Sequence, residues 1–331
     1  MINYIVIESR SSTTKQMFSD MLKIPGAVVT SNIFNISNPI LKMINRIHMS
    51  VKIAEHISLP FKKIWDKFYI TDAVNKNPGK KYIIILTNVS VKKFNIDYLK
   101  QLTKKDNASL VLILADSSVS MRKGFFPLHI IKQINFDLIY SFDQDDCKNY
   151  NFIYTNSIYS KKDVDTQPMR KAHLFFVGRV KGRLDQLIQI AKKADENSCV
   201  CNFLIHGADK KTRKGVKGIT YIEKYITYDD ALSMILSSGC LLDINQAGQS
   251  GMTPRVYDAI FYNKKLITNN KNVTQLKYYN PEYMKIINDI DEIDYNFIKA
   301  DTPVDYNYKG EYSPLYLAED IEKRLFAAVS E

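Results

Sequence analysis

The chain has 331 residues, of which 45% are hydrophobic, and it carries a formal net charge of +11. This length exceeds what a single core usually serves, and the composition excludes a disordered chain, so two folded domains are expected. The four cysteines form no CxxC pair and have no histidine partner at zinc spacing, which excludes a zinc module. The start, MINYIVIESRSS, lacks the pattern of a signal peptide, and no window reaches the roughly 18 apolar residues of a membrane span. We therefore expect a cytoplasmic protein with reduced thiols, or one attached only at the inner face of the cell membrane.

Positive charge is concentrated in the first half of the chain. Residues 1–165 contain 23 Lys and Arg against 14 Asp and Glu, a net charge of +9, whereas residues 166–331 contain 23 against 21, a net charge of +2. A basic half of this kind attracts nucleic acid, anionic lipid or a phosphorylated acceptor. Nothing in the sequence resembles a helix-turn-helix, a zinc finger or an aromatic RNA-binding strand. We therefore expect an anionic membrane surface or a phosphorylated acceptor as partner, and no nucleic acid.

Apolar runs alternate with helical patterns along this first half, residues 1–165. The runs that predict strands are NYIVIE (3–8), KYIIILTN (81–88), SLVLILAD (109–116) and DLIYSF (137–142). Such alternation predicts a doubly wound parallel sheet, in which ligands bind beyond the carboxyl ends of the strands. Those ends are occupied by Glu8, Asn88 and Asp116.

Residues 40–69, ILKMINRIHMSVKIAEHISLPFKKIWDKFY, form a basic amphipathic pattern. Apolar side chains recur at helical spacing in its first part, and the only tryptophan of the chain, Trp65, follows among Lys62, Lys63 and Lys67. Such a segment binds anionic membrane surfaces. The alternative is a core helix that packs on the first sheet.

The run SFDQDD places Asp143, Asp145 and Asp146 in a DxD pattern. In some metal-dependent enzymes such a pattern holds a divalent metal on a substrate diphosphate. The motif is short and precedes the second half of the chain. We therefore expect a structural loop role and no bound metal.

A second series of strands follows the polar stretch SKKDVDTQPMRK (160–171), the best candidate for a linker. Its strands are predicted at HLFFVG (173–178), NFLIHG (202–207), GITYI (218–222), CLLDI (240–244) and KLITNN (265–270). Two doubly wound domains, residues 1–165 and 166–331, are expected. A closing amphipathic helix at 313–329 could pack back on the first domain.

The stretch GQSGMTPRVYDAIFYNKKLITNN (248–270) combines a glycine loop with a helix start. Thr253 is a good N-cap and Pro254 suits the first helical position. A loop followed by a helix N-terminus suits an anion such as phosphate, and Arg255 adds a fork of donors. The alternative is an ordinary helix start with a surface pair of Arg255 and Asp258.

The second half resembles the donor-binding domain of GT-B glycosyltransferases, which have two facing Rossmann-like domains with the active site between them. FFVGRVKGRLDQLIQIA is similar to the strand, basic loop and helix that open that domain, and NFLIHG to its next strand. ITYIEKYITYDDALSMILSSGCLLDINQ is similar to the block near the nucleotide base, and the glycine stretch to the loop that binds phosphates and ribose. More narrowly, YSFDQDDCKNYNFIYTNSIYS and LPFKKIWDKFY resemble bacterial lipopolysaccharide and capsular polysaccharide glycosyltransferases.

This resemblance implies a set of residues that bind a nucleotide diphosphate sugar. The diphosphate would be held by Gly178, Arg179, Lys181, Arg183, Arg255 and the N–H groups near Ser250 and Gly251. Thr253 would cap the helix, and Asp258 would bind ribose. Around the base and sugar we expect His206, Gly207, Tyr225, Gln246 and Gln249, although the histidine could be a packed side chain and the glutamines plain loop amides. Many retaining members have a glutamate where this chain has Ser250, so a role for that acid does not transfer.

The resemblance also implies a metal-independent transfer without a cofactor, in which basic groups stabilise the leaving diphosphate. The candidates for the catalytic base are Glu8 and Asp116. We therefore expect a glycosyltransferase that extends a lipid-linked or surface polysaccharide. The alternatives are a nucleotide-sugar epimerase of the same fold, and a non-catalytic partner that anchors another transferase at the membrane.

Overall fold

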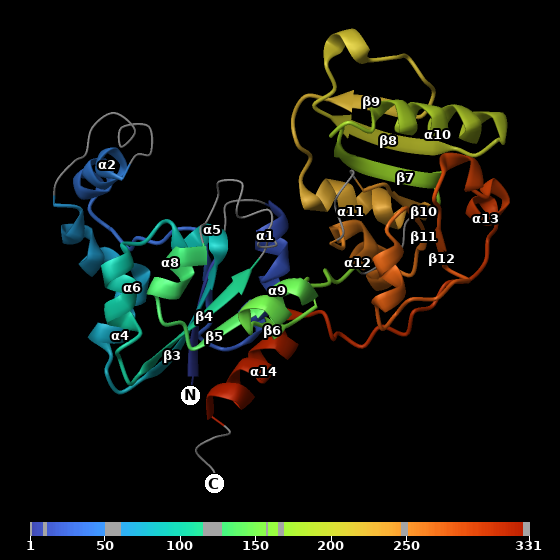
Figure 1. Cartoon of the computed structure of the whole chain (residues 1–331). Helices are drawn as coiled ribbons and strands as arrows, with labels where there is room; N and C mark the ends of the chain where they lie inside the picture. The colour runs from blue at the N-terminus through green and yellow to red at the C-terminus, as the bar shows by residue number, and fades with distance from the viewer. Residues whose placement is uncertain are drawn as a thin grey trace. The chain divides into compact units, whose positions relative to one another are not determined.

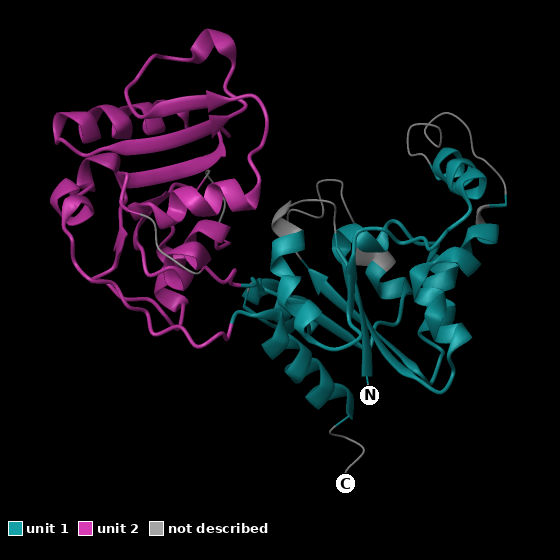
Figure 2. Ribbon diagram, turned by 180° about the vertical axis from the view of Figure 1, so that it is seen from behind, with its two compact units in different colours: residues 1–160, 312–331 teal, residues 161–311 magenta. Residues whose placement is uncertain are grey.

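The computed structural model describes residues 2–8, 12–49, 61–114, 128–156, 158–164, 169–245 and 251–326. The chain divides into two compact units, residues 1–160 with 312–331 (unit 1) and residues 161–311 (unit 2), shown in different colours in Figure 2. The predicted boundary after residue 165 therefore lies within unit 2, and the C-terminal helix belongs to unit 1.

The described strands of unit 1 form one six-stranded parallel sheet in the order β2-β1-β3-β4-β5-β6. Their bounds are β1 (Ile2–Ile7), β2 (Val28–Thr30), β3 (Lys81–Thr87), β4 (Ala108–Leu114), β5 (Leu138–Ser141) and β6 (Ile153–Tyr154). The chain builds outward from β1 first to β2 and then, on the other side, to β3 and beyond. The switch point, where ligands of doubly wound sheets bind, therefore lies between the carboxyl ends of β1 and β3.

Helices cover both faces of this sheet (Figure 1). The α-helices are α1 (Ser12–Met17), α2 (Pro39–His48), α4 (Ala73–Lys76), α5 (Asn88–Val91), α6 (Ile96–Leu102), α8 (Leu128–Gln133), α9 (Gln144–Tyr150) and α14 (Pro314–Phe326). The 3₁₀ turns are η1 (Ser19–Lys23), η2 (Lys62–Phe68) and η3 (Ile70–Asp72). No helix in these described ranges, or in those of unit 2, is long and apolar enough to cross a bilayer.

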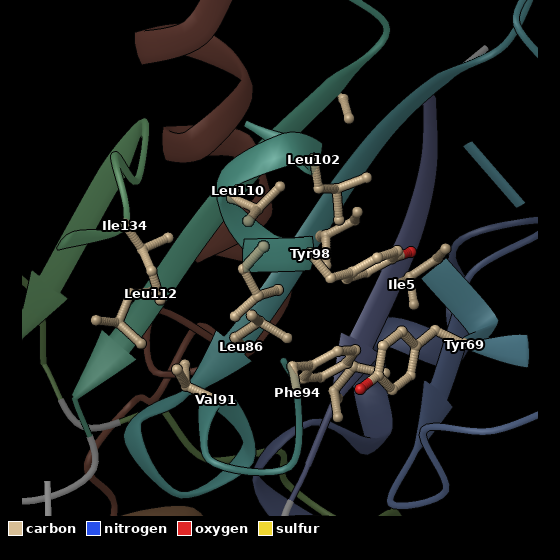
Figure 3. Packing of buried hydrophobic residues seen from close by; sticks show 14 of the residues in the cluster. Ile5, Tyr69, Leu86, Val91, Phe94, Tyr98, Leu102, Leu110, Leu112 and Ile134 are labelled. Carbon is tan, nitrogen blue, oxygen red and sulfur yellow. The ribbon is translucent and has the colours of Figure 1, made fainter. Parts of the chain in front are cut away.

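The core of unit 1 explains why these strands are buried on both faces. On one face, strand residues such as Leu86 and Leu112 pack against α5, α6 and α8 (Figure 3). An aromatic cluster closes that face, with the Tyr69 ring 4.8 Å from Phe94 and 4.7 Å from Tyr98, centroid to centroid. On the other face α14 packs, and its Glu322 carboxylate accepts a 2.5 Å hydrogen bond from the Tyr4 hydroxyl of β1.

Unit 2 repeats the plan with a parallel six-stranded sheet of described strands in the order β12-β11-β10-β7-β8-β9. The strands are β7 (Ala172–Arg179), β8 (Cys201–His206), β9 (Ile219–Ile222), β10 (Ser238–Asp243), β11 (Lys265–Thr268) and β12 (Met284–Ile286). The helices are α10 (Leu184–Glu196), α11 (Tyr228–Leu236), α12 (Pro254–Phe261) and α13 (Tyr295–Lys299), with 3₁₀ turns η4 (Lys210–Thr212), η5 (Lys271–Gln275) and η6 (Ile290–Glu292). Its switch point lies between β7 and β10.

Successive side chains of β7 point to opposite faces, and each face has its own helices. Leu174 and Phe176 face α10 and α13, whereas the Phe175 ring faces α12. The predicted class, two Rossmann-like doubly wound α/β units, is confirmed.

Candidate functional site

The carboxyl ends of β7 and β10 bring several of the predicted donor residues together in unit 2. Gly178 and Arg179 end β7, and the glycine loop that follows β10 leads into α12. Because β7 and β10 are neighbours at the switch point, the helices that follow them pack on opposite faces of the sheet. This leaves the strand ends accessible to a ligand.

A tight turn after β7 directs Arg183 back over the strand end. Lys181 (φ 38°) and Gly182 (φ 78°) adopt left-handed backbone conformations, and the exposed Lys181 side chain points to solvent. The Arg183 guanidinium lies 5.1 Å from the centre of the Phe176 ring, and its Nη2 donates to the Arg179 carbonyl at 3.1 Å. A Cβ atom at Gly178 would lie 3.1 Å from that Nη2, so glycine makes room for the guanidinium.

The Arg183 side chain is incompletely satisfied. Its Nε is buried and has no hydrogen-bond partner among the described residues. Burial lowers the pKa of the guanidinium, and the Asp243 carboxylate acts in the opposite direction. Buried donors are rarely left unpaired, so this group is ready to donate to a ligand oxygen.

Asp243, the last residue of β10, organises the start of α12. Its carboxylate accepts hydrogen bonds from the hydroxyls of Thr253 (2.8 Å) and Thr268 (3.0 Å). The Thr253 hydroxyl in turn caps α12 by accepting from the Arg255 N–H at 3.2 Å, which confirms the predicted N-cap. Burial raises the pKa of Asp243, while the two hydroxyls and nearby arginines lower it. Asp243 was not among the predicted site residues, although its position is visible in the sequence as the acid near the end of the apolar run CLLDI.

Asparagines at the end of β11 hold both ends of the glycine loop. Asn269 accepts from the Asn245 N–H at 2.7 Å and donates to the Asn245 carbonyl at 3.2 Å. Asn270 donates to the Gly251 carbonyl at 3.2 Å. These roles were also missed, although the pair is visible in KLITNN. The other predicted loop residues lie outside the described residues: Gln246, Gln249 and Ser250.

Arg255 and Asp258 form a buried pair on α12. The Arg255 Nη1 lies 3.2 Å from Asp258 Oδ2, and the two side chains are 12% and 2% exposed. The Tyr228 hydroxyl donates to Asp258 Oδ1 at 3.0 Å, and the guanidinium lies 5.4 Å from the centre of the Phe175 ring. The alternative of a surface pair is therefore wrong. The Asp258 carboxylate is already bonded to Arg255 and Tyr228. Its contact with ribose stays a prediction, and such a contact would require a ribose hydroxyl to replace one of these two partners.

Burial raises the pKa of Asp258 to about 6, with Arg255 and the Tyr228 hydroxyl acting in the opposite direction. The folded protein thus keeps this proton to a higher pH than the unfolded chain, whose Asp pKa is about 4. Stability from this group is therefore full below pH 4 and is lost as the pH rises to about 6. At 1.36 kcal/mol per pKa unit, the loss is about 3 kcal/mol.

We therefore expect the wild type to lose about 3 kcal/mol of unfolding free energy relative to Asp258→Asn between pH 4 and pH 7. Urea unfolding of both proteins at several pH values measures this difference, and other titrating groups cancel in the comparison. A difference that does not change with pH would contradict the buried, ionisable Asp258.

An exposed aromatic surface lies beside this site at the ends of β8 and β9. The Tyr225 ring, 66% exposed, stacks on His206 with centroids 4.1 Å apart and planes inclined by 21°. The Arg179 guanidinium lies 6.0 Å from the centre of the Tyr225 ring. His206 is fixed by a 3.1 Å contact between Nε2 and the Glu223 carbonyl, and Gly207 follows with φ 76°. A flat exposed ring next to cationic side chains suits a nucleobase attached to phosphates.

Glu8 occupies the corresponding position in unit 1, at the carboxyl end of β1 beside the switch point. Its side chain is 6% exposed, and Oε2 has no hydrogen-bond partner in the described part of the chain. Burial raises the pKa of this carboxyl, while Lys15 and Lys93 lower it. An unpaired carboxylate oxygen with a raised pKa is suited to accept a proton. The second candidate base, Asp116, lies outside the described residues.

The DxD run has a structural role. The Asp143 carboxylate caps α9 by accepting from the N–H groups of Asp145 and Asp146, both at 3.0 Å. Within the described ranges, no cluster of three or more His, Cys, Asp or Glu is arranged to hold a metal ion.

Helix α2 carries an exposed apolar face. Ile40, Met43, Ile44 and Ile47 are 64, 59, 43 and 51% exposed. The opposite side of the helix faces the protein, where Asn45 is buried. In the described part of this segment, the alternative of a helix with its apolar face in the core is therefore wrong.

The prediction also placed Trp65 in the membrane-binding segment, and this part is wrong. Trp65 is 1% exposed, and its Nε1 donates to His48 Nδ1 of α2 at 2.8 Å. The tryptophan thus attaches α2 to η2 instead of lying on the surface. Phe61 and Ile64 are the exposed apolar residues of this part, at 77 and 50%, and the Lys63 side chain is 75% exposed beside them.

Comparisons with known proteins agree with this architecture. No protein-family model matches the sequence, and neither does any curated protein. An alpha-glucosyltransferase solved with UDP-glucose and DNA containing an abasic site is similar over 98% of this chain and 93% of that chain, at 12% identity and a TM-score of 0.52. The glycotransferase of kitacinnamycin (10% identity, 98% of both chains, TM-score 0.47) and T4 phage beta-glucosyltransferase (11% identity, 98% of this chain and 96% of that chain, TM-score 0.42) are also similar. The first of these likenesses shows a shared fold, the GT-B class expected from the sequence.

Proposed function

We propose that the protein is a glycosyltransferase that moves a sugar from a nucleotide diphosphate sugar to a lipid-linked or surface polysaccharide acceptor. In this reaction the bond between the anomeric carbon and the diphosphate breaks, and its electron pair leaves with the diphosphate. The acceptor oxygen forms the new bond to the sugar, and its proton passes to a base. The single observation that carries the proposal is the buried, unpaired Nε of Arg183 at the switch point of unit 2.

The donor is proposed to bind across the carboxyl ends of β7 and β10. Arg183 and Arg179 would contact the diphosphate and stabilise the negative charge that develops on it, so that no metal is needed. Arg255 is proposed to contribute positive charge without contacting the diphosphate directly, because its guanidinium is already paired with Asp258. The exposed Tyr225 ring would stack on the base, and the glucosyltransferase of the same fold, which was solved with UDP-glucose, supports a donor of this class.

The acceptor is proposed to bind unit 1, with Glu8 as the base. The net charge of +9 in residues 1–165 favours a phosphorylated, lipid-linked acceptor at an anionic membrane. The same charge would also suit DNA, which is present in the complex of the similar glucosyltransferase. The apolar face of α2 favours lipid, because phosphate backbones are bound by cationic and polar groups and not by exposed isoleucines. An epimerase would need neither a basic acceptor surface nor an apolar one.

Substitution of Arg183 tests the donor site. A thermal-shift screen with UDP, GDP, CMP and TDP sugars identifies the nucleotide, and calorimetry then measures its affinity. Arg183→Ala should weaken binding by about 1.5–3 kcal/mol, the range for hydrogen bonds to charged groups. This corresponds to about 10- to 150-fold in Kd.

Lys192→Ala is the matched control, because it removes the same charge from an exposed position of α10. It should bind the nucleotide like the wild type. Equal losses in the two variants, or no nucleotide that raises the Tm, would overturn the donor site.

A further inference from the structure

A hollow of about 590 Å³ lies in unit 1, away from Glu8. It is lined by the end of α8, the start of β5, the end of α9 and the turn before β6. Residues 134–136 and 151–152 precede the first residues of their strands, so the hollow lies at the amino ends of the parallel strands. Glu8 follows the carboxyl end of β1, at the opposite edge of the same sheet. The volume is typical of a small-ligand site, and the proposed reaction does not use it.

The floor and one wall of the hollow are built from buried isoleucines and aromatic rings. Ile131 and Ile134 form the floor, and each is 2% exposed within the core of unit 1. Tyr150 and Phe152 form an aromatic wall, with ring centroids 5.4 Å apart and planes inclined by 30°. Asn151 between them adopts a left-handed conformation (φ 56°) that ends α9, and this reversal brings the two rings together.

The rim is polar and rich in amides. Asn135, Asn149 and Asn151 are exposed, as are Lys132 and Lys148, and none of the described lining residues is acidic. The lysines lie in the last turns of α8 and α9, where they offset the negative helix ends, so the rim does not require an anion. Amides both donate and accept, which matches hydroxyl groups, and aromatic rings match the apolar C–H face of a sugar ring.

We infer that this hollow is a second saccharide-binding site, separate from the site of transfer. Two aromatic rings beside exposed amides, over buried isoleucines, fit a sugar ring better than a phosphate or a bare apolar chain. In the proposed polysaccharide transferase, such a site would retain the polymer while its end reacts elsewhere. The binding itself does not depend on the proposed function, but this use of it does.

The test is binding of the fluorescently labelled wild-type protein to an array of neutral and acidic bacterial oligosaccharides, with saturating UDP present to fill the donor site. Wild-type binding is then compared with a double variant, Asn135→Ala with Asn149→Ala, which alters only exposed amides. We expect the double variant to bind the captured oligosaccharides at least tenfold more weakly. Tyr150→Leu, which keeps an apolar side chain, should have a comparable effect.

Asn77→Ala, at an exposed amide elsewhere in unit 1, serves as the control and should bind like the wild type. Capture of no oligosaccharide by the wild type, or capture that the double variant and Tyr150→Leu leave unchanged, would overturn the inference. Nucleotide binding measured on the same proteins distinguishes the donor-site proposal from the saccharide-site inference. A protein that binds no nucleotide should still bind saccharide at the hollow in unit 1.

Discussion

Glu8→Gln should lower kcat by about 10²- to 10⁴-fold, the range for loss of a general base. The substitution keeps the shape of the side chain and removes only its capacity to take a proton. Because burial raises the pKa of Glu8, the wild type should lose activity on the acid side at a higher pH than an exposed glutamate would. The pH–rate profile of the variant should lack this decrease on the acid side, its acid limb. Steady-state kinetics against pH measure both effects, and donor affinity at unit 2 should remain unchanged.

Asp137→Asn is a matched control for Glu8→Gln. Partial desolvation also raises the pKa of Asp137, although the residue as a whole is exposed, and its carboxylate accepts from the Leu110 N–H at 2.7 Å, near the amino end of β5. An asparagine oxygen can accept the same bond, so activity should be retained. If Glu8→Gln keeps full activity and its acid limb, Glu8 is not the base, and the role passes to another group such as Asp116.

The longer strands of both sheets were predictable because each contains a continuous apolar run. Runs such as KYIIILTN and CLLDI are buried on both faces of a parallel sheet and need no knowledge of their partners. The short strands β2, β6 and β12 were not predicted, since two or three residues give no periodic pattern. Thr253 was found for a local reason, because N-capping depends on the adjacent residues alone.

The pairings that organise the donor site could not be found in this way. Asp243 is held by Thr253 and Thr268, and Asn269 holds the loop from 24 residues further along the chain. These pairings depend on which strands become neighbours, and the sequence pattern does not state that. The orientation of α2 was also beyond local reasoning, because helical spacing shows that an apolar face exists but not whether it meets the core or solvent.

Replacing Ile40, Ile44 and Ile47 by serine should abolish sedimentation of the protein with anionic vesicles. These side chains are 64, 43 and 51% exposed on one face of α2, so each would gain contact with lipid on binding. Full burial of an isoleucine contributes about 1.5–3 kcal/mol, and half of this for three side chains gives roughly 2–4.5 kcal/mol. At 1.4 kcal/mol per tenfold, binding should weaken at least about 30-fold. The measurement is co-sedimentation with vesicles of phosphatidylglycerol and phosphatidylcholine.

Charge should contribute separately from the apolar face. Glutamate at Lys62, Lys63 and Lys67 should also prevent sedimentation, because each cation near an anionic surface contributes about 1 kcal/mol. For the same reason 0.5 M salt should release much of the wild type, since screening then acts within about 3–10 Å. Leu22→Ser, at a side chain that is 61% exposed on η1, is the control and should bind vesicles like the wild type.

The outcomes distinguish the two acceptor classes. Because α2 belongs to unit 1, every variant should keep its nucleotide affinity in unit 2. A wild type that ignores anionic vesicles at low salt would contradict the membrane proposal and leave the apolar face of α2 to a protein partner. A wild type that instead binds duplex DNA, with affinity unaffected by the serine substitutions but lost in the glutamate variant, would make DNA the acceptor. Sedimentation that fails in both variants while Leu22→Ser binds normally would support α2 and its lysines as the membrane-binding surface.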